Sequence, residues 1–129
     1  MTTDLWMLVY TALLSMVFFA TYGIGRFQTP GGLEWAFGNR ETPLVVPEWT
    51  NRAMRAHLNL VENIGPFAIL VLVAHVSGHA NATTALGATL FFWGRVAHAA
   101  TYIAGLIYVR TAVFFVATIG ELMILAQLF

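Results

Sequence analysis

Long apolar runs alternate with short polar segments along the chain, and this pattern predicts four helices. The first apolar run, Leu5 to Ile24, is long enough to cross a membrane. A polar connection from Arg26 to Trp49 follows it, and the prolines and glycines there interrupt any continuous helix. The four helices are predicted over about residues 4–25, 50–77, 82–107 and 110–128.

Polar residues occupy the first half of the second predicted helix. Its purely apolar part, Ile64 to Val76, is too short for a hydrocarbon core of about 30 Å. The span therefore extends back through Glu62, Asn59 and Arg55, which places all three side chains at membrane depth. Ionisable side chains at this depth indicate a functional site, because they are costly in hydrocarbon.

Short connections link the last three predicted helices. Residues 77–81 form a turn, and little chain separates the third helix from the fourth around residues 106–109, so these two helices are expected to form an antiparallel hairpin.

Thr50 and Asn51 are the candidate N-caps of the second helix, because their side chains accept hydrogen bonds from free backbone N–H groups.

The composition of the chain indicates that these helices belong to a membrane protein. The chain is 59% hydrophobic and 9% charged, with mean hydropathy +0.75, whereas soluble domains carry roughly 25% charged residues. We therefore predict a single all-α integral membrane domain over residues 1–129. The net charge is zero and lysine is absent, which argues against nucleic-acid binding. With no cysteine, any thiol chemistry must come from a ligand.

The placement of arginine predicts the orientation of the helices. Four of the six arginines lie in or beside the long connection, and Arg110 begins the fourth helix, whereas the turn at residues 77–81 and both termini have none. By the positive-inside rule, the long connection and the turn before Arg110 face the cytoplasm. The first apolar run follows Asp4 and lacks a convincing cleavage site, so we expect a retained helix. A compact chain without a targeting signal favours a bacterial inner membrane.

The polar residues fall on single helical faces. Arg55, Asn59 and Glu62 share a face of the second helix, and Arg95, His98 and Tyr102 share a face of the third. Glu62 and Arg95 lie about 18 Å from the cytoplasmic ends of their helices. An ion pair between them is therefore plausible, either to lock the bundle or as part of a ligand site. The fourth helix contributes a face with Arg110, Phe114, Ala117 and Glu121.

The deep arginines outnumber the deep carboxylates. Arg55, Arg95 and Arg110 face only Glu62 on the cytoplasmic half, so positive charge is left over. Lipid headgroups are one source of the missing anion. The other is a small carboxylate-bearing ligand in a cytoplasm-facing pocket, which arginine binds with two parallel hydrogen bonds. The histidines show no metal-binding spacing with an acidic partner, so no metal site is predicted.

Two motifs carry a resemblance to a known family. The first is Arg52-x-x-Arg55-Ala56-His57-x-Asn59-x-x-Glu62-Asn63-x-x-Pro66-Phe67, and the second is Gly94-Arg95-Val96-Ala97-His98-x-x-x-Tyr102 followed by Arg110. Together they resemble the MAPEG family, the membrane-associated proteins in eicosanoid and glutathione metabolism. The second motif is similar to that of its microsomal glutathione transferase and prostaglandin E synthase members.

The resemblance implies a left-handed, up-and-down four-helix bundle that assembles as a homotrimer. It also implies that glutathione, as co-substrate, binds between subunits near the cytoplasmic side. Arg110 would stabilise the glutathione thiolate, and an apolar electrophile would enter from the lipid. The glutathione-binding residues or their supporting shell would be Arg55, Asn59, Glu62, Arg95, His98 and Tyr102.

The chain departs from the prostaglandin synthase pattern at two positions. Thr111 and Phe114 stand where those members carry serine and tyrosine. The resemblance therefore implies a glutathione transferase or peroxidase rather than an eicosanoid isomerase. Two alternatives stay open: a non-catalytic member of the family that binds lipid or presents it to a partner protein, and an unrelated small transporter or structural subunit.

Overall fold

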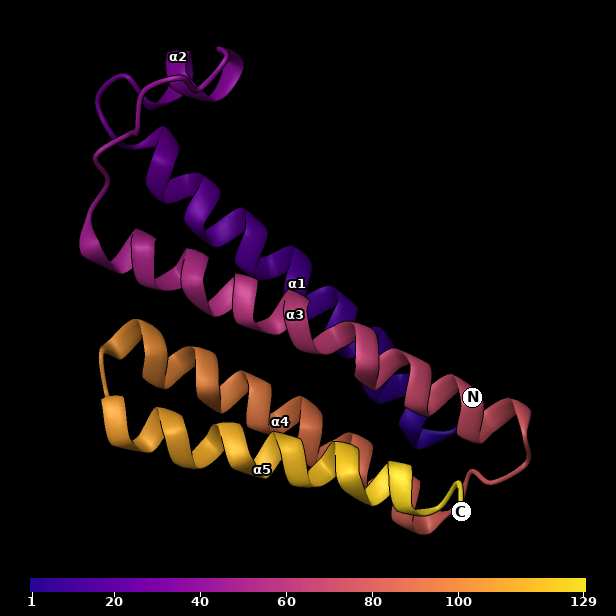
Figure 1. The fold of residues 1–129 in the computed structure, drawn as a ribbon. Coiled ribbons are helices and arrows are strands. Elements are labelled where there is room, and N and C mark those ends of the chain that lie inside the picture. Colours follow the sequence, from indigo (N-terminus) through magenta and orange to yellow (C-terminus); the bar gives the residue numbers. More distant parts are fainter.

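The computed structural model describes residues 1–129 and contains helices without any β-strand. Three of the helices, α1, α3 and α5, are long and apolar enough to cross a membrane. Figure 1 shows α1 beside α3 and α4 beside α5, with both termini at the end opposite α2. The elements are α1 (Thr3–Phe27), α2 (Gly32–Phe37), α3 (Glu48–Val76), α4 (Ala82–Ala104) and α5 (Ile107–Ala126).

The connection between α1 and α3 is more structured than the sequence predicted. It contains the short helix α2, which begins after Gly31 takes a left-handed conformation with φ 73°. Helix α3 begins at Glu48 with Pro47 at the N-cap position. The prediction of a Thr50 or Asn51 cap is therefore wrong, and the Thr50 side chain is buried.

The turn between α4 and α5 is only two residues long. Gly105 adopts φ 80°, and the next backbone N–H, that of Leu106, donates to the Thr101 carbonyl at 2.9 Å. This arrangement stops a helix, because glycine takes the left-handed region without steric penalty. As a result α4 ends at Ala104 and α5 begins at Ile107, each about three residues earlier than the sequence predicted.

Small residues bring α4 and α5 into close contact. A Cβ atom added to Gly87 would lie 2.6 Å from the Gly120 carbonyl oxygen, and one added to Gly94 would lie 2.9 Å from the Cβ of Ala117. Close backbone approach at small residues is typical of helix pairs in membranes. The antiparallel hairpin that holds Arg110 near α4 is thus fixed by direct helix contact.

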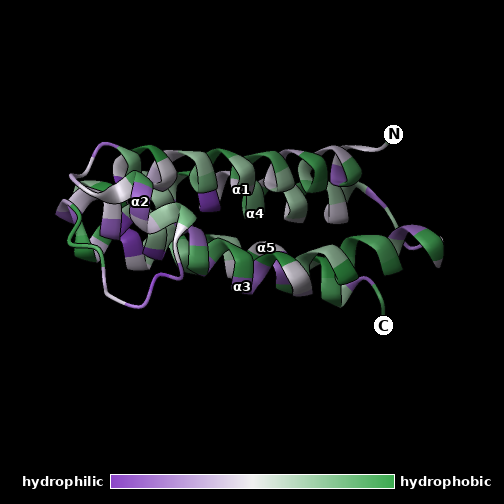
Figure 2. Cartoon of the chain, turned by 90° about the horizontal axis from the view of Figure 1, so that it is seen from above, coloured by the Kyte–Doolittle hydropathy of each residue, from purple (hydrophilic) through white to green (hydrophobic).

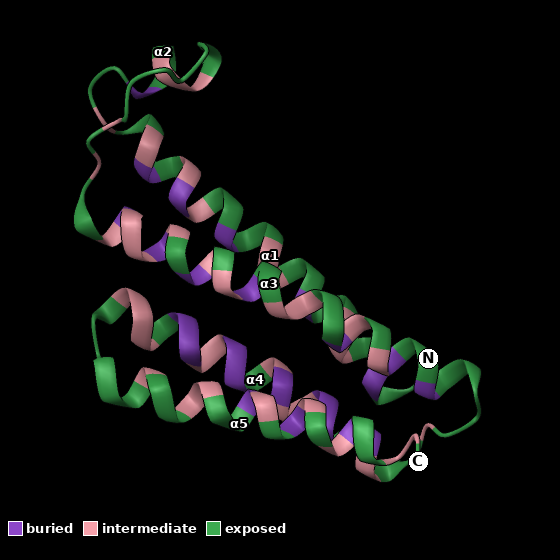
Figure 3. Cartoon of the chain, viewed as in Figure 1, coloured by how far each residue is buried: buried purple, intermediate pink, exposed green.

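The core is small and lies on the seam between the helices. The Phe67 and Phe91 rings stack there with centroids 3.9 Å apart, joining α3 to α4. Figure 3 shows buried positions on the faces between helices and exposed positions elsewhere. Many large apolar side chains are exposed, for example Phe19 and Ile69, each 63%. So much exposed apolar surface is unusual for a soluble monomer and fits a lipid surround.

Hydrophilic segments gather at one end of the molecule. Figure 2 shows them around α2 and the neighbouring ends of the long helices. Four arginines lie in or beside the connection that holds α2, namely Arg26, Arg40, Arg52 and Arg55. The apolar middle of the molecule and its polar end therefore separate as they do in a membrane-crossing protein.

Candidate functional site

A hollow of about 390 Å³ opens near the turn between α4 and α5, and we call it the Arg110 hollow. Helices α3, α4 and α5 all contribute to its lining. Four residues that the sequence singled out line it together, which places the two motifs in one site. The lining consists of Asn59, His98, Tyr102, Arg110, Thr111, Phe114 and Phe115.

Helical spacing and the tight turn assemble this lining. His98 and Tyr102 are one turn apart on α4, and their rings meet edge to face with centroids 5.6 Å apart. The two-residue turn then returns the chain so that the Arg110 Cζ atom lies 4.4 Å from the centre of the Tyr102 ring. A guanidinium over an aromatic face is held by cation–π attraction while its N–H groups stay available.

The charge in the Arg110 hollow is unbalanced. None of the lining residues is acidic, and Arg110 makes no side-chain hydrogen bond within the chain. A guanidinium has five N–H donors in a planar fork, which can bind both oxygens of a carboxylate or donate to a single anionic atom such as a thiolate sulfur. The hollow therefore offers a cation, a phenol, an imidazole and an amide to a small anionic ligand.

Arg95 lies behind this lining rather than in it. It is 1% exposed, and its Nη1 donates to Asn59 Oδ1 at 2.9 Å. Its guanidinium also lies over the rings of Phe91 and Phe114, at 5.0 and 5.1 Å from their centroids. Arg95 thus supports Asn59, whose amide forms part of the wall of the Arg110 hollow.

The expected pair between Glu62 and Arg95 is not formed within the chain. Glu62 is exposed on α3, and Nε and Nη2 of Arg95 have no hydrogen-bond partner. The carboxylate whose charge acts on Arg95 is instead Glu121 of α5, whose Oε1 is also buried without a partner. The sequence placed Glu121 on the same face as Arg110 but did not connect it with Arg95, because depth alone does not fix how two helices are rotated.

Besides Arg95, two more of the predicted site residues lie outside the Arg110 hollow. Arg55 and Glu62 are both exposed on α3 and do not line it. Their side chains are free for contacts beyond this chain. Within residues 1–129, no group of three or more histidine and acidic side chains is arranged to hold a metal ion.

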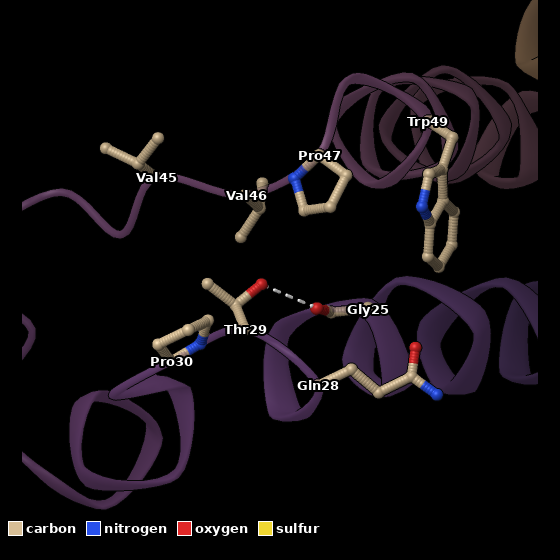
Figure 4. A pocket seen from close by; sticks show the side chains of 8 residues that line it. All are labelled: Gly25, Gln28, Thr29, Pro30, Val45, Val46, Pro47 and Trp49. Carbon is tan, nitrogen blue, oxygen red and sulfur yellow. Dashed lines mark hydrogen bonds between the residues drawn. The ribbon is translucent and has the colours of Figure 1, made fainter.

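A larger hollow of about 440 Å³ lies elsewhere, between the end of α1 and the start of α3 (Figure 4). Its lining includes Gln28, Thr29 and Trp49, and the Thr29 hydroxyl donates to the Gly25 carbonyl at 2.9 Å. No titratable side chain borders it. It lacks the groups for acid–base or anion chemistry, and the Arg110 hollow is the better candidate site despite its smaller volume.

The membrane-length apolar helices define an all-helical integral membrane protein, and the arginine-containing hollow lined by α3, α4 and α5 is its candidate site. The chain belongs to the MAPEG family, whose family model matches residues 3–129. A search of curated proteins found no match to the chain. Membership in this family associates the chain with glutathione-related membrane enzymes and their non-catalytic relatives.

Proposed function

We propose that the protein is a membrane glutathione transferase or peroxidase that acts on hydrophobic electrophiles. The observation that carries this proposal is Arg110 in a hollow without any acidic lining residue, its guanidinium unbonded and resting on Tyr102. A chain without cysteine needs an external thiol for such chemistry. The family provides the precedent for glutathione as that thiol.

Arg110 acts on the sulfur of the bound thiol. A free thiol is mostly protonated at neutral pH, and only the thiolate is an effective nucleophile. A guanidinium within hydrogen-bonding reach favours the charged form, so the thiol proton passes to water and the sulfur stays ionised. In a transfer reaction the thiolate then forms the sulfur–carbon bond as the electrophile loses its leaving group with the bonding electron pair.

The remaining lining residues orient the thiol and admit the electrophile. Asn59, His98 and Tyr102 provide polar groups for the peptide part of glutathione. Phe114 and Phe115 provide an apolar wall, and Phe115 is 58% exposed toward the surroundings of α5. An apolar electrophile dissolved in lipid is expected to enter along this side.

The homotrimer belongs to this proposal as well. Arg55 and Glu62 lie exposed on α3, away from the hollow of their own chain. In a trimer they would reach a ligand bound between subunits, which would complete the predicted set of glutathione-binding residues. Surrounding lipid covers the rest of the apolar surface, and neither nucleic acid nor metal takes part.

The proposed topology has four spans, which are α4 and the three candidate spans α1, α3 and α5. Helix α4 is 23 residues long and packs against α5 along the small-residue contact. At 1.5 Å per residue its length suits a hydrocarbon core of about 30 Å. The arginine-rich end would face the cytoplasm of a bacterial inner membrane, and the Arg110 hollow would open on that side.

The test is ultraviolet difference absorbance near the thiolate band while glutathione is titrated into the purified protein. We expect a saturable signal at neutral pH that is lost in Arg110→Ala and partly kept in Arg110→Lys. Loss of one charge-assisted hydrogen bond, about 1.5–3 kcal/mol, lowers the equilibrium constant for formation of the bound thiolate tenfold to hundredfold. Tyr108→Ala is the matched control, since Tyr108 is 91% exposed and does not line the hollow.

Conjugation of a lipophilic electrophile is measured on the same variants. An intact protein that gives no thiolate signal would reject the enzyme proposal and favour the lipid-binding members of the family. A thiolate signal that survives Arg110→Ala would keep a glutathione site but remove Arg110 from the role of thiolate stabiliser.

A further inference from the structure

A separate hollow lies where α1 ends and α2 begins, and we call it the Trp35 recess. It encloses about 350 Å³ and shares no lining residue with the Arg110 hollow. Its only charged lining side chains are Arg26 and Arg40. The apolar wall is formed mainly by Phe19, Ile24 and Phe27 of α1 and by Trp35 of α2.

Both arginines of the Trp35 recess stack on the same indole. The Cζ atoms of Arg26 and Arg40 lie 5.1 and 5.2 Å from the Trp35 ring. Arg26 also lies over the Tyr22 ring at 4.8 Å. The indole is fixed in turn, because its Nε1 donates to the Thr42 carbonyl at 2.6 Å. Two guanidinium groups are thereby held beside one rigid aromatic platform.

Neither cation is neutralised within the chain. Arg26 Nη2 contacts the Met54 sulfur at 3.0 Å, and Arg40 Nη2 donates to the Ala36 carbonyl at 3.1 Å. No acidic residue lines the recess. Most of the ten guanidinium N–H donors are therefore free, and two like charges beside one ring repel unless an anion lies near them.

The backbone conformation of Arg40 is a second, independent observation. Arg40 is the one residue other than glycine with positive φ, at 57°. Left-handed backbone is unfavourable for a long side chain, and such outliers cluster at ligand-binding positions. Here the conformation accompanies a guanidinium that folds back over Trp35 and the end of α2.

The position of the Trp35 recess at the polar end of the molecule indicates where its ligand would come from. Helix α2 contacts no helix other than α1, and it lies at the polar end of the molecule, beyond the apolar body of α1 (Figure 1, Figure 2). An apolar wall next to cations and an indole at the end of a membrane-length helix matches the headgroup boundary of a bilayer, where tryptophan and arginine gather.

We propose that the Trp35 recess binds an anionic phospholipid. The phosphate lies beside the guanidinium groups of Arg26 and Arg40, and the upper acyl chain packs on Phe27, Ile24 and Phe19. Charge complementarity selects an anionic headgroup over a zwitterionic one, whose own cation would meet the same two arginines. The site is independent of the proposed glutathione chemistry, because the two hollows share no residue.

Native mass spectrometry of the detergent-purified protein tests the site with phosphatidylglycerol and phosphatidylcholine of identical acyl chains at equal concentration. We expect selective retention of phosphatidylglycerol. Because anionic lipid attraction contributes a similar increment for each arginine, retention should fall about fivefold in Arg40→Gln and about thirtyfold in Arg26→Gln/Arg40→Gln. Arg40→Lys, which keeps the charge, should retain most of the lipid.

Arg55→Gln is the matched control, since it removes one exposed arginine outside the recess. Unchanged retention in this variant supports the site, and an equal loss would overturn it in favour of general surface electrostatics. Equal binding of the two lipids by the unmodified protein would also overturn it. Displacement of the lipid by millimolar glycerol 3-phosphate would identify a soluble-phosphate site instead.

A change of oligomeric mass in the double variant, with no lipid bound to the unmodified protein, would assign the recess to contact with a second copy of the chain and reject the lipid. Arg40→Gln lies in an exposed connection, so it provides a folded variant even where the double change disturbs α1.

Discussion

Replacing Asn59 by leucine is expected to destabilise the protein through Arg95. Asn59 Oδ1 is the single hydrogen-bond acceptor that the chain offers to the Arg95 guanidinium, at 2.9 Å. Leucine keeps a side chain of similar size but removes the acceptor. Arg95 then stays 1% exposed with Nε, Nη1 and Nη2 all without a partner.

The magnitude follows from the charge on Arg95. A hydrogen bond to a charged group contributes about 1.5–3 kcal/mol. Neutral hydrogen bonds between membrane helices average only about 0.6 kcal/mol. Because the Arg95 bond is charge-assisted and excluded from water, we expect Asn59→Leu to cost about 2 kcal/mol, at least three times the value for a neutral pair.

A double-mutant cycle with Arg95→Met isolates this bond. Methionine is unbranched and apolar, so in the Asn59→Leu background it removes the orphaned cation and should cost less than in the unmodified protein. The free energy of unfolding is measured by titrating the detergent-solubilised protein with sodium dodecyl sulfate while circular dichroism and tryptophan fluorescence are followed. We expect a coupling energy of about 1.5–3 kcal/mol.

A coupling energy below about 0.5 kcal/mol would refute this reasoning, since even an average neutral pair exceeds it. It would mean that lipid, water or a second copy of the chain satisfies the Arg95 donors, and that Asn59 is not held by Arg95. The Arg110 hollow would then lack the fixed amide that we assign to its wall.

Three further changes test other contacts by the same unfolding measurement. Gly120→Ala should cost about 1–3 kcal/mol, because its added Cβ meets a backbone carbonyl of α4. The control Gly65→Ala should be neutral or stabilising, because open space surrounds Gly65. Equal effects of the two changes would contradict the helix contact. Asn81→Ala should cost about 1 kcal/mol by removing the N-cap of α4, and an unchanged midpoint would show that the cap is replaced. Glu121→Gln removes the carboxylate whose charge acts on the buried Arg95 guanidinium, so it should lower the free energy of unfolding; a stabilised variant would contradict this attraction.

The sequence predicted the Arg110 hollow in part because helical spacing and a short turn determine which residues meet. His98 and Tyr102 are four residues apart and therefore share a face of α4. The connection to the next helix is too short for any arrangement but an antiparallel hairpin. Arg110 follows that turn, so its position above Tyr102 is a consequence of local geometry that the sequence contains.

The partner of Arg95 could not be predicted in the same way. Glu62 and Arg95 lie at equal depth, but depth leaves the rotation of each helix about its axis undetermined. That rotation is fixed by contacts between α4 and α5, such as Gly87 against Gly120, which bring Glu121 rather than Glu62 toward Arg95. The spacing of polar residues shows which of them share a face of one helix, but it does not show which faces of two helices pack together.

The sequence analysis also does not predict the short helix α2 or the N-cap of α4. Six residues from Gly32 to Phe37 are too few for a periodic pattern to stand out. Asn81 was assigned to a turn, although its Oδ1 accepts from the Thr84 N–H at 3.1 Å while the Thr84 hydroxyl accepts from Asn81 N–H at 2.9 Å. Asparagine three residues before threonine at the start of an apolar run is the sequence signal that could have revealed this capping box.

Arg95 and Arg110 differ in how many contacts their guanidinium groups make within the protein. Arg95 is buried between aromatic rings, bonded to Asn59 and subject to the charge of Glu121, so its removal should lower the free energy of unfolding. Arg110 rests on Tyr102 without a hydrogen bond, so its donors are available at no cost in protein contacts. Its substitution should therefore reduce ligand binding while the free energy of unfolding changes little. An Arg110→Ala protein as destabilised as Arg95→Met would make Arg110 a structural residue and leave the proposed chemistry without its cation.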